Sequence, residues 1–282
     1  MNIQENNAYM EVRNIYKSFP SVQKRKEKKL VLENISFALR KGEKLAIVGA
    51  SGCGKSTLLR ILAGLDEASS GDVFLDGNRV SGPGKDRGFV FQKASLFPWL
   101  TVEKNIKSSR QLRINMRIDD NEISRTVYRA NMLINLMGLQ GTERLYPSQI
   151  SGGMQQRVSI ARALVANPKV LLMDEPFSAL DSQTKENLYR IVSKIFMIEN
   201  ATSIIVTHDV NEAVLLCDRV IVLSPNPGRI DSEFDLLDIP RNDQGMARQD
   251  SHGYLDVVFA IRERIRGTTF SLEGKDIMID SG

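Results

Sequence analysis

Short runs of apolar residues recur along much of the chain and alternate with longer stretches in which apolar residues follow a helical spacing. The apolar runs, rich in Val, Ile and Leu, occupy residues 44–48, 170–173, 203–207 and 220–223. Runs of four or five such residues are typical of strands that are buried on both faces of a parallel sheet. Helical spacing predicts helices over residues 56–63, 182–199 and 210–216. This alternation indicates an α/β fold with a mostly parallel sheet.

The first part of the chain has a different pattern, which predicts antiparallel strands. Ile35, Phe37 and Leu39 place apolar residues at every second position, as a half-buried strand requires. The run at residues 10–15 resembles a strand, and Asp76-Gly77 has the composition of a two-residue hairpin turn. We therefore expect an N-terminal antiparallel β subdomain.

The middle and the end of the chain each change character again. From about residue 95 to 149 the strand signal fades and helical spacing appears, which predicts a helical subdomain of about residues 95–165 inserted into the α/β core. We place the main domain at residues 8–234. A C-terminal extension, residues 235–282, should contain a polar linker at 241–253 and a helix near 254–266.

Composition narrows the class of protein. The 282 residues are 42% hydrophobic and 26% charged, which is ordinary for a globular chain of one or two domains. Apolar stretches stay well below the roughly 18 residues of a membrane span, and the N-terminus lacks a secretory pattern, so we expect a cytoplasmic chain. The net charge is +4 and the densest basic cluster, residues 24–29, is interpreted as a solvated loop. Without a nucleic-acid motif, we expect no nucleic-acid partner.

A phosphate-binding loop follows the apolar run at 44–48. Gly49, Gly54, Lys55 and Ser56 satisfy the pattern G-x-x-x-x-G-K-[ST], and the predicted helix begins there. Glycines allow successive backbone N–H groups to converge on phosphate oxygens, Lys55 would reach the β- and γ-phosphates, and Ser56 would bind Mg²⁺. The residues predicted to bind ATP here are Gly49, Ala50, Ser51, Gly52, Cys53, Gly54, Lys55, Ser56 and Thr57.

Two further segments carry groups suited to ATP chemistry. Asp174 and Glu175 end the apolar run at 170–173, so Asp174 could hold Mg²⁺ and Glu175 could orient and deprotonate a water, although such a pair can also cap a helix. Ser151 precedes a long helical stretch, where its hydroxyl and the N–H groups of the next two residues would face an anion. A capped helix alone would not explain Gly152 and Gly153, which cost about 1 kcal/mol each.

These segments, together with Thr207-His208-Asp209, resemble the ATP-binding cassette (ABC) ATPases from about Tyr9 to Phe234. The resemblance implies a phosphate-loop NTPase core, hydrolysis of ATP with Mg²⁺, and a head-to-tail homodimer. In that family Ser151, Gly152 and Gly153 would form the signature that contacts ATP held by the partner subunit. His208 would be the switch histidine that contacts the γ-phosphate.

Other residues take roles that the resemblance implies. Gln92 would reach Mg²⁺ and the attacking water and link the site to a membrane partner. Asp181 would belong to the loop by which the two subunits sense each other. Adenine would stack on Phe19, with Tyr16 as the alternative, although either ring could equally be a core residue.

Within the ABC ATPases, the chain resembles the subunits of nitrate, sulfonate and taurine importers. This resemblance rests on segments 82–88, 96–99 and 146–157, in which Met154 departs from the common signature. It implies a subunit at the cytoplasmic face of the cell membrane that energises uptake of a small anionic solute.

The importer resemblance also implies partners. A membrane permease would dock near Gln92–Val102, and an extracytoplasmic solute-binding protein would belong to the same complex. The apolar residues of this segment could instead pack the core of the helical subdomain. The alternative function is a soluble ABC ATPase acting on DNA or ribosomes, although the chain shows neither a long coiled coil nor a second cassette.

Overall fold

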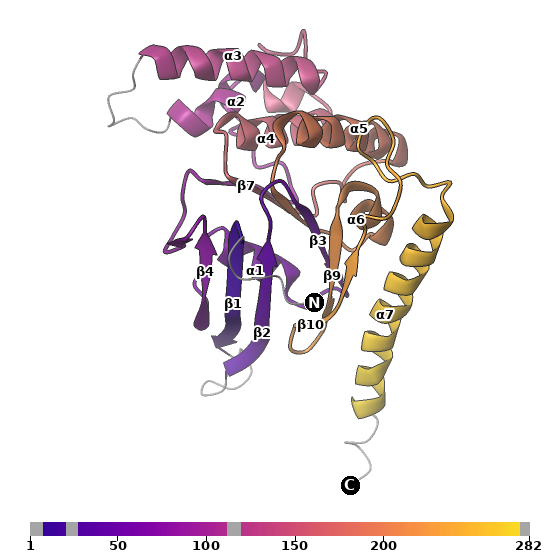
Figure 1. Cartoon of the computed structure of the whole chain (residues 1–282). Coiled ribbons are helices and arrows are strands. Elements are labelled where there is room, and N and C mark those ends of the chain that lie inside the picture. Colours follow the sequence, from indigo (N-terminus) through magenta and orange to yellow (C-terminus); the bar gives the residue numbers. More distant parts are fainter. Residues whose placement is uncertain (1–7, 21–27, 112–119, 277–282) are drawn as a thin grey trace. The chain divides into compact units, whose positions relative to one another are not determined.

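The computed structural model describes residues 8–20, 28–111 and 120–276, and its contacts divide the chain into two compact units (Figure 1). Unit 1 comprises Met1–Gly84 and Thr202–Gly282, and unit 2 comprises Lys85–Ala201. Of the basic cluster at 24–29, residues 24–27 lie outside the described residues, whereas Lys28 and Lys29 begin a strand and are exposed. The sequence prediction of a loop is therefore wrong for these two lysines.

Unit 1 contains the predicted antiparallel sheet. Its strands have the order β2-β1-β4-β5, with β1 at Met10–Pro20, β2 at Lys28–Leu39, β4 at Ser70–Leu75 and β5 at Asn78–Arg79. The alternating residues Ile35, Phe37 and Leu39 are all buried, as predicted. Asp76 and Gly77 have φ values of 51° and 74° between β4 and β5, which is the left-handed backbone that a two-residue hairpin turn needs.

A second sheet of unit 1 carries strands in the order β10-β9-β3-β8. Strand β3, Lys44–Gly49, runs parallel to β8, Ser203–Val206, and to β9, Arg219–Ser224. These three strands are the apolar runs predicted from the sequence. Strand β10, Arg229–Asp235, pairs antiparallel with β9 and was not predicted, because its charged residues hide the strand pattern.

Among the described residues of unit 1, three helices accompany the sheets: α1 at Lys55–Leu62, α6 at Val210–Leu216 and α7 at His252–Asp276. Helix α7 packs on α6, β9 and β10 (Figure 1) and buries Tyr254, Val258 and Ile261, which lie on one helical face. The segment before it, predicted as a polar linker, is packed as well. The Ala247 N–H donates to the Leu215 carbonyl at 2.9 Å, and Met246 is buried.

Unit 2 combines a parallel strand pair with the predicted helices. Strand β6, Arg87–Val90, pairs with β7, Val170–Asp174. The helices are α2 at Val102–Gln111, α3 at Asp120–Leu136, a short 3-10 helix at Pro147–Gln149, α4 at Gly152–Val165 and α5 at Ser182–Glu199. Helices α2, α3 and α4 pack on one another, so the helical character predicted for the middle of the chain is confirmed.

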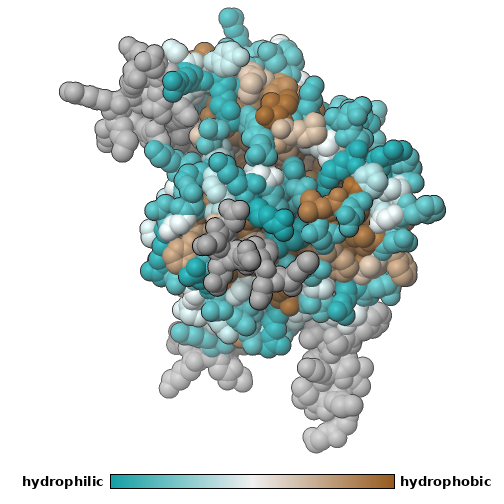
Figure 2. Space-filling view, in the orientation of Figure 1, coloured by the Kyte–Doolittle hydropathy of each residue, from teal (hydrophilic) through white to brown (hydrophobic). Residues whose placement is uncertain are grey.

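On the face shown in Figure 2, most of the surface of the described residues belongs to hydrophilic residues. Within residues 8–20, 28–111 and 120–276, the structure has no helix of the length and apolar character that a membrane span requires.

Candidate functional site

The phosphate loop of unit 1 has a backbone that only glycine adopts readily. Gly49, Gly52 and Gly54 have φ values of 156°, 78° and 99°. A Cβ atom on Gly49 would lie 2.5 Å from the carbonyl oxygen of Leu223, and one on Gly54 would lie 2.6 Å from Leu32 Cδ2. The glycines of the motif therefore meet both a conformational and a packing requirement.

Lys55 is the first residue of α1, and its ammonium group is held against the loop. Its Nζ donates to the carbonyl oxygens of Gly49 at 2.7 Å and Ala50 at 2.9 Å, and the residue is only 6% exposed. The positive charge and the helix N-terminus thus lie beside the same turn, which favours an anion there. Cys53 is fully buried, and burial raises the pKa of its thiol, so it fills space as a neutral side chain.

Unit 1 also contains His208 and the two residues proposed to stack on adenine, Phe19 and Tyr16. His208 follows β8 and is exposed, whereas Thr207 beside it is buried. Phe19 is 39% exposed at the end of β1, and Lys17 Nζ lies 4.8 Å from its ring centroid. Tyr16 is half-buried in the same strand. The exposed Phe19 ring is therefore more accessible to a stacking base than the Tyr16 ring.

Unit 2 brings Gln92 and Glu175 together. Asp174 is the last residue of β7, and Glu175 follows with a left-handed φ of 43°. The Gln92 Nε2 donates to Glu175 Oε2 at 3.1 Å and to Ser178 Oγ at 3.3 Å, and Ser178 Oγ donates to the Glu175 carbonyl at 3.0 Å. The sequence analysis did not place Ser178 beside Gln92 and Glu175. Because α5 begins only at Ser182, Asp174 and Glu175 do not cap it, which excludes that alternative.

The signature segment begins helix α4 as predicted. Ser151 is the N-cap, and its Oγ accepts from the Met154 N–H at 3.3 Å. Gly152 has open space around it, but a Cβ on Gly153 would lie 2.6 Å from Thr184 Cγ2. The contact with the Thr184 methyl group in α5 is a structural reason for a glycine at position 153, which helix capping alone does not supply.

Asp181 has a structural role in unit 2. It is the N-cap of α5, and its Oδ1 accepts from the Thr184 N–H at 3.0 Å. Hydrogen bonding to Thr184 lowers the pKa of the Asp181 carboxyl, which is then charged at neutral pH. Since Gly153 approaches Thr184, the first turns of α4 and α5 lie side by side, and Ser151 and Asp181 each cap one of them.

The apolar segment after Gln92 is exposed at its centre. Trp99 is 70% exposed, and its ring centroid lies 5.5 Å from that of Phe97. The fully buried Asn105 holds the segment in shape: its Oδ1 accepts from the Phe97 N–H at 2.8 Å, and its Nδ2 donates to the Leu100 carbonyl at 2.9 Å. A core role is therefore excluded for Trp99, and Asn105 is a residue that the sequence analysis missed.

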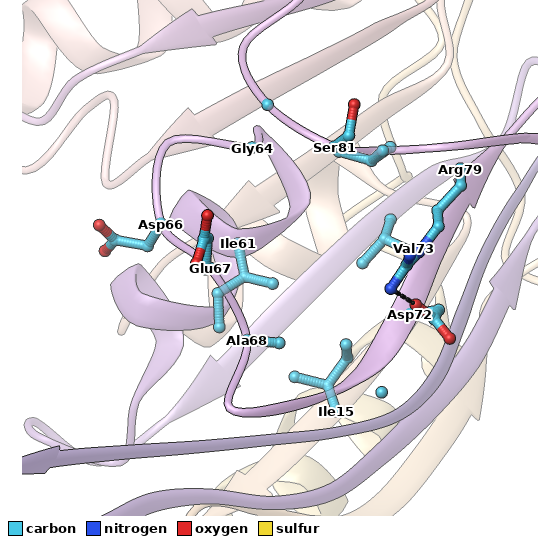
Figure 3. A pocket seen from close by; sticks show the side chains of 13 residues that line it. Ile15, Ile61, Gly64, Asp66, Glu67, Ala68, Asp72, Val73, Arg79 and Ser81 are labelled. Carbon is cyan, nitrogen blue, oxygen red and sulfur yellow. Dashed lines mark ion pairs between the residues drawn. The ribbon is translucent and has the colours of Figure 1, made fainter.

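A pocket elsewhere in unit 1 lies between the end of α1 and the antiparallel sheet (Figure 3). Asp72 and Arg79 form an ion pair at its wall, and Asp66 pairs with Arg60 at 2.7 Å. None of the residues predicted for the ATP site lines it. The pocket is therefore distinct from the phosphate loop.

The phosphate loop between β3 and α1, and an acidic pair at the end of strand β7, define a phosphate-loop NTPase. Comparisons with known proteins narrow this class. The family model described as ABC transporter matches residues 32–178. The chain is 45% identical over 213 residues to the aliphatic sulfonates import ATP-binding protein SsuB of Bacillus anthracis, covering 75% of this chain and 81% of that protein.

Two other similarities agree with this match. The nitrate import ATP-binding protein NrtD of Synechocystis sp. is 47% identical over 210 residues, covering 73% of this chain and 76% of that protein. A solved dimeric ATP-binding cassette in a post-hydrolysis state, bound to ADP and Pi, superposes with a TM-score of 0.69 at 32% identity, covering 80% of this chain and 98% of that one. The chain belongs to the ABC transporter family and is an ATP-binding cassette ATPase.

Proposed function

We propose that this ATPase energises the import of a small anionic solute such as a nitrate, sulfonate or taurine. The observation that carries the proposal is the similarity, over about three quarters of the chain, to ATP-binding proteins named for the import of aliphatic sulfonates, nitrate and taurine. The ATPase domain would span residues 8–234, with residues 235–282 as an extension.

ATP would bind first to the phosphate loop. Backbone N–H groups of residues 49–57 and the ammonium of Lys55 would hold the phosphates. The positive charge of Lys55 and the N-terminus of α1 lie beside the same turn, and both favour an anion there. Adenine would stack on the exposed ring of Phe19, with Tyr16 as the alternative.

Hydrolysis requires a metal ion and an oriented water. Ser56, Asp174 and Gln92 offer a hydroxyl, a carboxylate and an amide oxygen, which are hard donors that fit Mg²⁺. When bound, Mg²⁺ would neutralise charge on the phosphate oxygens. Glu175 would act as general base on the attacking water, and Gln92, which donates to Glu175 at 3.1 Å, would hold the carboxylate in place. His208 would contact the γ-phosphate.

The signature would act on a second subunit. Ser151, Gly152 and Gly153 present a capped helix N-terminus to which a γ-phosphate held by a partner copy could bind. Asp181, at the neighbouring helix N-terminus, would contact the partner. The similarity to a dimeric cassette supports this homodimer.

The membrane partner would dock at Gln92–Val102. The exposed Trp99 pairs with the half-buried Phe97 on a segment that Asn105 keeps in shape, and such a preformed apolar anchor suits a protein contact. We place the subunit at the cytoplasmic face of the membrane, with a permease and an extracytoplasmic solute-binding protein in the same complex and no nucleic acid.

The substitution Glu175→Gln tests this proposal. It should retain ATP binding, lower kcat by about 100-fold or more through loss of the general base, and accumulate an ATP-bound dimer in size-exclusion chromatography. Glu186→Gln, on the exposed face of α5, is the control and should behave like the wild type. An unimpaired rate in Glu175→Gln would contradict the role of Glu175.

The import function has its own test. Cells with and without the gene should differ in ATP-dependent uptake of nitrate, taurine or an alkanesulfonate, and the protein should copurify with a membrane permease. Recovery with ribosomes or DNA, and not with a permease, would contradict the importer proposal and favour the soluble ABC ATPase.

A further inference from the structure

A buried polar network lies directly beside His208 in unit 1. Thr207 and Glu212 are 1% and 3% exposed. The Thr207 hydroxyl donates to Glu212 Oε2 at 2.7 Å and accepts from the Asp209 N–H at 3.0 Å. A carboxylate buried to this degree is costly unless it receives hydrogen bonds, so this arrangement indicates a specific role for the pair.

The network modifies an ordinary helix cap. Asp209 is the N-cap of α6, with its Oδ1 accepting from the Asn211 N–H at 2.9 Å, and Glu212 is the third residue of the helix. In a capping box, an acid at this third position accepts directly from the backbone N–H of the N-cap residue. Here the hydroxyl of Thr207 stands between the Asp209 N–H and the Glu212 carboxylate. The capping interaction is thereby extended back to the residue that precedes His208.

The network holds the backbone on both sides of His208. On the preceding side, the Thr207 N–H donates to the Ile47 carbonyl at 3.2 Å, in the strand that leads into the phosphate loop. On the following side, the Asp209 N–H is held by the Thr207 hydroxyl. The side chain of His208 itself is exposed. The anchored neighbours therefore present the imidazole from a backbone position that is tied to the phosphate-loop strand.

We propose that Thr207 and Glu212 are positioning residues for His208, and that their hydrogen bond sets the direction in which the imidazole is presented. The inference rests on the proposed role of His208 in ATP hydrolysis. Loss of the Thr207 hydroxyl would leave the Asp209 N–H and the Glu212 carboxylate without their shared partner. The peptide of His208 could then shift, and small displacements of a catalytic group lower the rate steeply.

The substitution Thr207→Val tests the hydroxyl, because valine keeps the shape and removes both hydrogen bonds. We expect kcat for ATP hydrolysis to fall by about 10-fold or more, with KM for ATP within about twofold of the wild type, since the displaced group acts in the chemical step. Thr207→Ser keeps the hydroxyl and should recover most of kcat. Likewise Glu212→Gln, which keeps an acceptor oxygen, should retain more activity than Glu212→Leu.

Thr202→Val is the matched structural control. Thr202 is 4% exposed in the same unit, and its Oγ1 accepts from the Gly42 N–H at 2.8 Å, away from the network of Thr207 and Glu212. It should lower the melting temperature to a similar degree as Thr207→Val and leave kcat close to the wild-type value. An equal fall of kcat in both variants would overturn the inference, because the effect would then be general destabilisation.

The variant His208→Ala separates this inference from the proposed function. Thr207→Val should have less than about a twofold effect on kcat in the His208→Ala background, because the two act as one unit. If His208→Ala alone leaves kcat unchanged, the proposed role of His208 fails. If His208→Ala lowers kcat but Thr207→Val does not, or if the two effects multiply, only the positioning role is overturned.

Discussion

The two adjacent glycines of the signature should respond in opposite ways to the same substitution. Gly152 and Gly153 lie in the first turn of α4, but a Cβ on Gly152 would meet no atom within 4 Å, whereas one on Gly153 would lie 2.6 Å from Thr184 Cγ2. Carbon atoms in contact are normally about 3.5–4.0 Å apart. Gly153→Ala would therefore press a methyl group roughly 1 Å too far into the first turn of α5.

The magnitudes follow from helix propensity and packing. Replacing an exposed helical glycine by alanine gains up to about 1 kcal/mol, so Gly152→Ala should raise the free energy of unfolding by about 0.5–1 kcal/mol. Gly153→Ala gains the same propensity but incurs an overpacking cost of about 1–3 kcal/mol. The two variants should consequently differ by about 1–3 kcal/mol, which corresponds to several degrees in melting temperature at about 2–4 °C per kcal/mol.

Urea and thermal unfolding without nucleotide would measure this difference, and a third variant identifies its cause. Thr184→Ser removes Cγ2, the methyl group that the new Cβ would meet, and keeps the hydroxyl. In that background Gly153→Ala should be about as stable as Gly152→Ala. Equal stability of the two alanine variants in the wild-type background would refute the close-packing explanation of Gly153. A deficit that persists with Thr184→Ser would locate the strain elsewhere.

Two further predictions concern a surface and a charge. Trp99 is the single tryptophan of the chain and is 70% exposed, so acrylamide should readily quench its fluorescence. Binding of a permease at this segment should reduce that quenching. Weak quenching in the isolated subunit would contradict the exposure of Trp99. Hydrogen bonding to Thr184 lowers the pKa of Asp181 in the folded state, so the stability that its charge contributes is present at neutral pH and lost as the pH falls through that pKa. The difference in urea midpoint between the wild type and Asp181→Asn, which keeps a capping oxygen, should therefore be larger at pH 7 than at about pH 3, and a difference that does not change with pH would argue against this linkage.

Elements with strong local patterns were predicted well. Helices α5 and α6 begin and end at the residues expected. The buried strands β3, β7 and β9 each contain the apolar run that predicted them, and β8 covers residues 203–206 of the run at 203–207. Strand β10 was missed because its alternation places charged residues on an edge strand. The packing of the segment before α7 was also missed, because a few buried side chains such as Met246 are outnumbered by polar neighbours.

The sequence by itself determined the features that local chemistry dictates. The glycines of the phosphate loop and the cap Ser151 could be located from residue types and spacing, because backbone conformation and helix ends depend on residues near one another in the chain. The composition of the signature and of the segment around His208 likewise pointed to the family.

Only the tertiary structure decided which side chains meet. The contact of Gln92 with Glu175 joins residues far apart in the chain, and the close approach of Gly153 to Thr184 depends on how two helices pack. Even the bond between Thr207 and Glu212, only five residues apart, depends on burial that removes both groups from water. Such contacts arise from the arrangement of strands and helices in three dimensions, which residue spacing along the chain does not specify.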